Sequence, residues 1–323
     1  MEFFKQTKTI NFMGSSKIAM AFSIFLVLSS FVLLATKGLN YGVDFAGGTI
    51  VQVQYQGTAP IDKMRAQLKE QEMFKGASIT EFGSPDEVII RLKSSSKDVS
   101  KDIGDVAREA LKGTGEFKIR RVDIVGPKVG NELREKGVMS LLLAMLGILI
   151  YVSFRFEWRF AIASIFALIH DISIALGALA LTQIDVNLDV LAALLTILGY
   201  SLNDTIIVFD RIREGIIKAK NTVLSVVINE SVTKTLSRTT LTSLTTFFVV
   251  LTLFINGGEI IHSFAFTLLV GVVVGTYSSI FVASPILMWL GFDIKNYHSK
   301  LADKAKRHAE KEKMRAQFEQ GTV

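Results

Sequence analysis

Long apolar runs dominate this chain and restrict what it can fold into. The first, Ile18 to Ala35, is long enough to cross the hydrocarbon core of a bilayer as a helix. It exceeds the roughly 7 to 15 apolar residues of a cleaved signal peptide, so we expect an uncleaved span rather than a secretory signal cut near Ala35. Five further runs follow at Val138 to Val152, Phe160 to Leu181, Val190 to Phe209, about Thr235 to Ile255, and Phe264 to Leu290. The sequence therefore predicts six transmembrane helices.

Composition agrees with an integral membrane protein, because half the residues are apolar and the mean hydropathy is +0.41. Charged residues still make up 20 %, so they must gather outside the lipid. The absence of cysteine excludes disulfides, thiolate catalysis and zinc–thiolate sites. Residues 37–136 hold 17 basic and 15 acidic side chains, so most of the net charge of +6 comes from other segments. That distribution is typical of a membrane topology signal, and no nucleic-acid partner is indicated.

Residues 37–136 change from continuous apolar sequence to alternating and amphipathic patterns. The predicted elements, in order, are a strand at Thr49 to Tyr55, a helix at Ile61 to Met73, strands at Ile79 to Phe82 and Glu87 to Leu92, a helix at Val99 to Leu111, and a strand at Phe117 to Val125. This order matches the ferredoxin-like plan. We therefore expect an N-terminus and first helix in 1–36, a ferredoxin-like α+β extracytoplasmic domain in 37–136, helices two to six in 137–291, and a basic tail in 292–323.

The stretch YGVDFAGGT, from Tyr41 to Thr49, precedes this domain. Its glycines permit tight backbone turns, which favours a structural junction between the membrane and the domain. A phosphate-binding loop is the alternative, but the GxGxxG and GxxxxGK[ST] spacings are absent. We expect no cofactor and no catalytic residue.

Loop charges predict the orientation, because short cytoplasmic loops are rich in lysine and arginine. The loops Thr182 to Asp189 and Asn256 to Ser263 contain neither residue and are assigned outside. The loops and tail assigned inside carry Arg155, Arg159, Arg211, Arg213, Lys218, Lys220, Lys234 and eight more basic residues after Phe292. Both termini are therefore predicted to be cytoplasmic. The tail is expected to be a solvated or membrane-surface helix, and His298 and His308 lack flanking residues that would make a metal site.

Three predicted spans contain groups that lipid does not tolerate alone. The third has His170 and Asp171, the fourth Asn203 and Asp204, and the fifth Arg238. A charged side chain at the bilayer centre costs about 2.5 to 3.5 kcal/mol on insertion scales, so each group must face protein or water. Such residues are candidates for a functional site.

Asp204 and Arg238 both lie within about 5 to 8 Å of the cytoplasmic end of the apolar layer, at roughly 1.5 Å per helical residue. A direct or water-mediated pair between them is therefore plausible, with Ser201 and Asn203 as polar support. Such a carboxylate can load and release a proton, although a static ion pair is the alternative. His170 and Asp171 form either a structural pair or part of the same proton pathway, whereas Asp210 is expected to be a helix-end carboxylate.

Small residues recur at helical spacing in two spans and favour close helix packing. The sixth span has Gly271, Gly275, Ser279 and Ala283 at four-residue intervals. The third has the stripe Ala163, Ala167, Ala175 and Ala178 beside Asp171. We expect a packed bundle with its polar groups pointing inward.

Several of these stretches together resemble the SecF family, the smaller membrane subunits of bacterial SecD–SecF protein-export complexes in the resistance-nodulation-division superfamily. The resemblance covers nearly the whole chain and is carried by YGVDFAGGT, IVGPKVG at 124–130, FRFEWR at 154–159, HD at 170–171, GYSLNDTIIVFDRIRE at 199–214, TLSRTTLTSLTT at 235–246 and GTYSSIFVAS at 275–284.

The resemblance implies a non-enzymatic subunit of the bacterial cytoplasmic membrane, one six-span half of a twelve-span unit whose other half is SecD. It implies action beside a SecY-containing translocon, where protons flowing through the bundle help move unfolded preproteins, with Asp204 and Arg238 at the family's proton-pathway positions. A scaffold that stabilises translocon assembly is the alternative. A small-molecule exporter is less favoured, because the external domain is only about 100 residues and no drug pocket is evident.

Overall fold

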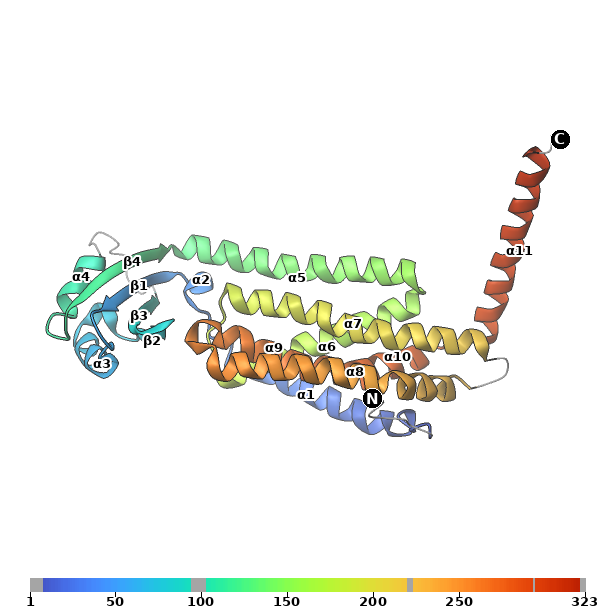
Figure 1. Ribbon diagram of the computed structural model, residues 1–323, viewed down its shortest axis with the longest axis horizontal. Coiled ribbons are helices and arrows are strands. Elements are labelled where there is room, and N and C mark those ends of the chain that lie inside the picture. The colour runs from blue at the N-terminus through green and yellow to red at the C-terminus, as the bar shows by residue number, and fades with distance from the viewer. Residues whose placement is uncertain (1–7, 94–102, 220–222, 293, 320–323) are drawn as a thin grey trace.

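The computed structural model describes residues 8–93, 103–219, 223–292 and 294–319, which form a helical bundle with a small α+β domain at one end (Figure 1). Within these residues six helices are long and apolar enough to span a membrane, as predicted. They are α1 (Ser16–Thr36), α5 (Pro127–Arg155), α6 (Trp158–Thr182), α7 (Leu188–Lys218), α8 (Leu224–Asn256) and a sixth span made of α9 (Gly258–Ser278), η3 (Ser279–Ala283) and α10 (Ser284–Trp289).

The centre of the bundle is formed by α6, α7 and the sixth span, while α1, α5 and α8 lie outside, with few of their residues fully buried. Small residues allow the inner helices to approach closely. A methyl group added at Gly271 would collide with Ile197 of α7, and one at Gly177 would collide with Ser30 of α1. The outer helices present the apolar surface that a bilayer or a partner helix covers.

The segment between the fourth and fifth spans is more helical than the sequence suggested. The fourth predicted apolar run ends at Phe209 and the fifth begins at about Thr235, but α7 continues to Lys218 and α8 begins at Leu224. Charged pairs one turn apart support the extension, since Glu214 accepts from Arg211 at 2.7 Å and from Lys218 at 2.6 Å. The end of the apolar run is therefore not the end of the helix.

The sixth span contains one turn of π-helix, η3, at Ser279–Ala283. The hydroxyl of Ser284 donates to the carbonyl of Ser279 five residues earlier, at 3.1 Å. Single π-turns inside α-helices rotate the residues that follow and occur frequently at functional sites. This turn begins directly after Ser278, whose contacts are described below.

The small domain has the predicted ferredoxin-like order. It contains α2 (Val43–Ala46), β1 (Gly48–Tyr55), α3 (Ile61–Glu70), η2 (Glu72–Phe74), β2 (Ser78–Phe82), β3 (Ser84–Lys93), α4 (Ile103–Ala110) and β4 (Phe117–Val125). The strands form one antiparallel sheet in the order β2-β3-β1-β4. The predicted first helix stops three residues early, at Glu70, and residues 99–102 of the predicted second helix lie outside the described residues.

Alternation along the strands explains how this domain forms its core. Val51 and Val53 of β1 are fully buried, as are Val88 and Ile90 of β3, while the residues between them point to the other face. Met64 of α3 packs against this buried face. The period-two pattern seen in the sequence is thus the pattern of the core.

The YGVDFAGGT stretch forms a tight connection between the domain and the bundle. The Asp44 carboxylate accepts a hydrogen bond from the backbone N–H of Leu188 at 3.0 Å, which caps the start of α7. Gly47 has φ +77°, and a methyl group there would lie 2.9 Å from the Cα of Pro127 at the start of α5. Through these two contacts the motif connects the starts of α7 and α5 to strand β1, which follows it.

The N-terminal end of the described chain and the long helix α11 (Ile294–Glu319) lie at the end of the bundle opposite the α+β domain (Figure 1). A 3-10 turn, η1 (Met13–Ser15), precedes α1. A ring nitrogen of His298 lies 2.9 Å from the carbonyl oxygens of both Ile216 and Ala219, at the end of α7. His298 thus contacts the last carbonyls of α7, while the predicted tail helix projects away from the bundle.

Replacing Asp44 with alanine should lower the free energy of unfolding by about 1 kcal/mol, because α7 loses an acceptor at its N-terminus. The measurement is thermal unfolding of the purified protein in detergent. Asp44→Asn keeps an acceptor oxygen and should lose less. Asp62→Ala, at a fully exposed position on α3, is the control. Equal stability of Asp44→Ala and wild type would contradict the assigned cap.

Gly271→Leu should destabilise the bundle by about 1 to 3 kcal/mol, because the new side chain overlaps Ile197 and forces α9 away from α7. The matched control is Gly147→Leu on α5, where an added methyl group has no atom within 4 Å. Unfolding in the same detergent should separate the two variants. If they melt together, close packing at Gly271 is not limiting.

Candidate functional site in the helical bundle

Two carboxylates are buried inside the bundle. Asp171 of α6 is 0 % exposed and Asp204 of α7 is 1 % exposed. Both helices are apolar around these residues, so each carboxylate needs partners from neighbouring helices. The neighbouring helices supply different hydrogen-bond partners to the two carboxylates.

Asp171 is held by three side chains from three helices. Its Oδ1 lies 2.9 Å from Nδ1 of His170, and its Oδ2 accepts hydrogen bonds from Ser201 of α7 at 2.5 Å and from Ser278 of α9 at 2.9 Å. The His170 ring stacks on Tyr277 at a centroid distance of 6.1 Å. Among the described residues, Nε2 of His170 has no hydrogen-bond partner. The Asp171 cluster therefore links α6, α7 and α9 and leaves one ring nitrogen unused.

Asp204 has fewer partners. Its Oδ2 accepts one hydrogen bond, from Ser243 of α8 at 3.2 Å, and Ser243 in turn accepts one from Thr276 of α9 at 2.8 Å. Thr276 and Ser278 lie two residues apart on α9, and Ser201 and Asp204 lie within one turn of α7. The two clusters therefore form one polar seam through α6, α7, α8 and α9.

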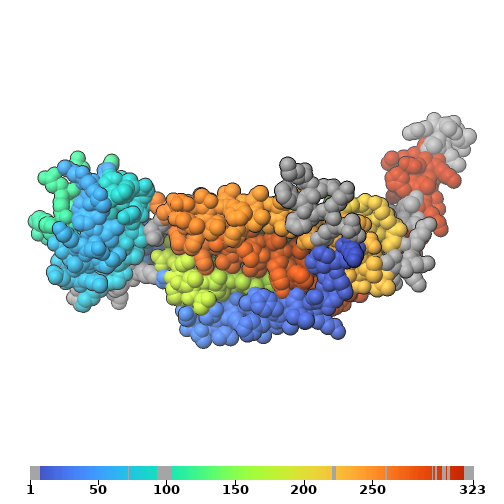
Figure 2. Space-filling model, turned by 60° about the horizontal axis from the view of Figure 1, so that its bottom comes forward, coloured from blue at the N-terminus to red at the C-terminus, as the bar shows by residue number. Residues whose placement is uncertain are grey.

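Arg238 does not contact Asp204 in this structure. Its side chain is exposed, and within the described residues it forms no ion pair with any carboxylate. Thr242 and Thr245 share its face of α8, but they are also exposed and their hydroxyls donate to carbonyls of their own helix. Figure 2 shows α8 on the outer surface of the bundle. The Arg238 face therefore points away from this bundle.

A hollow of about 280 Å³ lies beside this face. It is lined by Ile206, Asp210, Lys234 and Arg238, among others. Asp210 is half exposed and lies 3.0 Å from Arg213 and 3.7 Å from Arg155. Its expected place at a helix end is wrong, because α7 continues beyond it to Lys218. The hollow connects Arg238 to the charged end of the bundle.

The structure separates the predicted polar supports of Asp204. Ser201 is buried but donates to Asp171, and Asn203 is exposed with no hydrogen bond to any described residue. Sequence reasoning missed Ser243, Thr276 and Ser278. The signal for Ser243 was present in the spacing of the buried face of α8, which also carries Ser231, Thr235 and Thr239. That face is distinct from the one that carries Arg238.

The structure also positions the small residues of the sixth span. A methyl group at Gly275 would lie 3.0 Å from Cβ of Ser201, so α9 approaches α7 beside the polar seam. Ser279 is buried and donates to the carbonyl of Thr276 at 2.9 Å. This close approach allows the short hydroxyl side chains of α9 to contact the carboxylate of α6.

Six spanning helices, an α+β domain inserted between the first two and carboxylates inside the bundle define a polytopic α-helical membrane protein. Residues 106–293 match the family model described as protein export membrane protein SecD/SecF, C-terminal, and residues 32–59 match the SecD/SecF GG motif. The chain is 47 % identical over 323 residues to a protein translocase subunit SecF of Helicobacter pylori, with both chains fully covered. It is 48 % identical over 289 residues to the SecF of Vibrio alginolyticus, covering 89 % of this chain and 91 % of that protein. The chain belongs to the SecF family of protein translocase subunits.

A solved structure shows the same architecture. The crystal structure of SecDF, a translocon-associated membrane protein from Thermus thermophilus, superimposes with a TM-score of 0.75 at 36 % sequence identity. The match covers 90 % of this chain and 40 % of the SecDF chain. A super-membrane-facing form of SecDF gives a TM-score of 0.69 at 33 % identity, covering 94 % of this chain and 41 % of that one. This chain therefore aligns with less than half of each of these longer SecDF chains.

Removing a donor to Asp171 should destabilise the bundle. Ser201→Ala and Ser278→Ala should each lower the free energy of unfolding by about 1 to 3 kcal/mol, because a buried carboxylate oxygen loses a hydrogen bond. Thermal unfolding in detergent measures the loss. Ser140→Ala is the control, since that exposed hydroxyl bonds only a carbonyl of its own helix. A Ser278→Ala protein as stable as the control variant would contradict the importance of this contact.

Proposed function

We propose that this chain couples proton flow to protein export, working with a SecD-type subunit beside a SecY-containing translocon to move unfolded preproteins across the bacterial cytoplasmic membrane. The observation that carries the proposal is the position of Asp204. It is buried in a membrane-spanning helix with a single hydroxyl donor, next to a helix whose arginine is unpaired among the described residues. A carboxylate with so few partners is suited to changing its protonation state.

In this proposal Asp204 is the group that titrates, and Arg238 is the charge that favours proton release when the two approach. Serine and threonine hydroxyls both donate and accept hydrogen bonds, so Ser243 and Thr276 can pass a proton along the seam. Ser201, Asp171 and His170 are proposed to continue the pathway. Asn203 is proposed to act on the outer face, because it lies on the exposed side of α7.

The outward polar face supports a partner subunit. Arg238 and Asn203 are exposed on adjacent spanning helices, and polar or charged groups within a membrane span are unfavourable when they face lipid. Helices of another subunit can cover these residues and supply polar groups. The proposed partner is SecD-type, because the SecDF chain that this protein resembles extends well beyond the matched region.

The proposed orientation has both termini in the cytoplasm and the α+β domain on the other side of the membrane. Basic loops and the basic tail support it through the preference of cytoplasmic loops for lysine and arginine. The N-terminal end and the start of α11 lie at the same end of the bundle, opposite the domain (Figure 1). Protons released from Asp204 would then leave towards the cytoplasm past Arg238, through the hollow beside Asp210.

A scaffold that only stabilises translocon assembly is the second candidate. It is favoured by the exposed apolar face of α5, with Leu142, Leu143 and Leu146 each at least half exposed, which offers a surface for partner helices. A scaffold needs this surface and the packing of the bundle, but it does not need a titrating carboxylate. The two candidates therefore differ in their response to a change at Asp204.

Asp204→Asn should leave the complex assembled but remove the stimulation of export by a proton gradient. The substitution keeps the size and the acceptor oxygen of the side chain and removes only its ability to ionise. Export into inverted membrane vesicles is measured with and without a gradient, beside co-purification of the partner subunit. Asp62→Asn on α3 is the matched control. Unchanged gradient dependence in Asp204→Asn would exclude the proton-coupling role and favour the scaffold.

A further inference from the structure

Strand β4 forms an edge of the sheet. It pairs with β1 along residues Phe117 to Val125, and no other described strand pairs with it. An edge strand presents backbone N–H and C=O groups that a further extended chain can pair with. With nine residues, β4 is long enough to hold such a segment.

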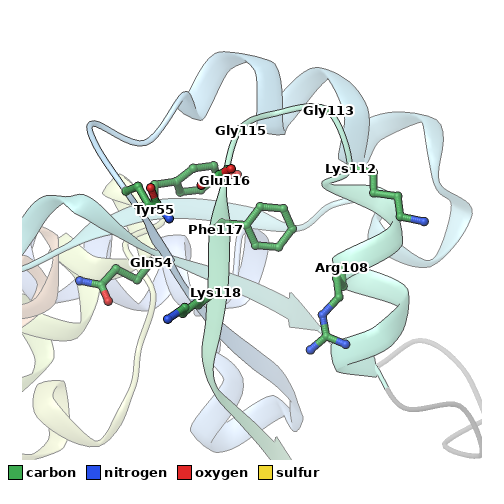
Figure 3. A pocket seen from close by; sticks show the side chains of 10 residues that line it. Gln54, Tyr55, Arg108, Lys112, Gly113, Gly115, Glu116, Phe117 and Lys118 are labelled. Atoms are coloured by element: carbon green, nitrogen blue, oxygen red, sulfur yellow. The ribbon is translucent and has the colours of Figure 1, made fainter.

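A hollow of about 610 Å³ lies beside this edge, where β4 begins and α4 ends. Figure 3 shows Phe117 projecting from β4 towards α4, with Lys118 on the other side of the strand. Arg108 and Lys112 line the hollow from α4 and its end. The edge is thus flanked on one side by an aromatic ring and on both sides by basic groups.

Charge restricts what can bind there. The hollow is lined by Arg108, Lys112 and Lys118 against a single acidic residue, Glu116. Arg108 and Lys112 remain 60 % and 69 % exposed although each pairs with a carboxylate of its own helix. Arg121 on the solvent face of β4 is 70 % exposed, although it pairs with Asp123 of the same strand at 2.7 Å. Like charges oppose pairing between two copies of this edge, whereas an acidic strand gains favourable contacts on both faces.

We propose that β4 binds an extended polypeptide segment rich in acidic side chains by adding it to the sheet. Alternate side chains of the segment would face Arg108 and Lys112 on one side of the sheet and Lys118 and Arg121 on the other. The segment belongs to an unfolded chain in transit, an assignment that rests on the proposed function. Strand binding itself requires neither the proton gradient nor Asp204.

The test uses the full-length protein in detergent and a fluorescent nine-residue peptide, the length of β4, in which valine and glutamate alternate. Fluorescence anisotropy should show binding that weakens as salt is raised. The same peptide methylated on alternate backbone nitrogens should bind roughly tenfold more weakly, because a ladder hydrogen bond is lost at each methyl group. A peptide with lysine in place of glutamate should not bind. Equal binding of methylated and unmethylated peptides would overturn strand addition.

Charge reversal on the strand provides the matched variant. The double variant Lys118→Glu and Arg121→Glu should no longer bind the glutamate peptide and should instead bind the lysine peptide. An unfolded domain cannot produce this new binding. Lys63→Glu with Lys69→Glu on α3 makes the same change in charge away from the edge and should bind like wild type. If both double variants respond alike, the edge is not the binding site.

Two further results separate this inference from the proposed function. Asp204→Asn should bind the glutamate peptide normally, so loss of proton coupling and loss of peptide binding are distinguishable. Addition of the partner subunit should leave peptide binding intact. Displacement of the peptide by the partner would show that the edge is a subunit interface and would overturn the assignment to an extended segment.

Discussion

Every polar group inside the lipid layer must find a partner within the protein, and the arrangement of this bundle depends on that constraint. Asp171 and Asp204 lie on neighbouring helices, and neither has an acceptable environment until a third helix supplies hydroxyl groups. Glycine at position 275 lets α9 approach Ser201 closely enough for Ser278 to contact Asp171. The small residues therefore let the helices approach closely, and this close approach brings the hydroxyl groups into contact with the buried carboxylates.

The two carboxylates differ in how many hydrogen-bond partners surround them. Asp171 has a histidine and two serines around it, which satisfy both oxygens and fix its orientation. Asp204 has one serine at 3.2 Å and lies on α7 beside the helix that carries Arg238 outward. A fully bonded carboxylate holds helices together, whereas a sparsely bonded one changes partners at lower cost. We infer that Asp204 is the group that titrates and that Asp171 holds the neighbouring hydroxyls of the proposed pathway in place.

Sequence reasoning predicted the six spans, the order of strands and helices in the domain and the residues Asp171 and Asp204, because apolar length, alternation and intramembrane charge are strong signals. It missed Ser243, Thr276 and Ser278, since a hydroxyl in an apolar helix is common and its role depends on helix rotation. The π-turn after Ser278 rotates only the residues that follow it, and it too leaves no mark in hydrophobic periodicity. Tertiary packing also determines the hydrogen-bond partners of the predicted polar supports. Ser201 donates to Asp171 instead of Asp204, and Asn203 lies at the surface.

The junction between domain and bundle connects the two proposed activities. Asp44 caps the start of α7, the helix that carries Asp204, and β1 begins only four residues later. β1 pairs with β4, and β4 continues through Gly126 directly into α5, whose first residue contacts Gly47. A displacement of α7 that accompanies proton release would therefore be transmitted through short, hydrogen-bonded connections to the sheet whose edge is proposed to hold the extended chain. The rigidity of that connection, rather than the size of either site, is what would allow a proton in the membrane to act on a polypeptide outside it.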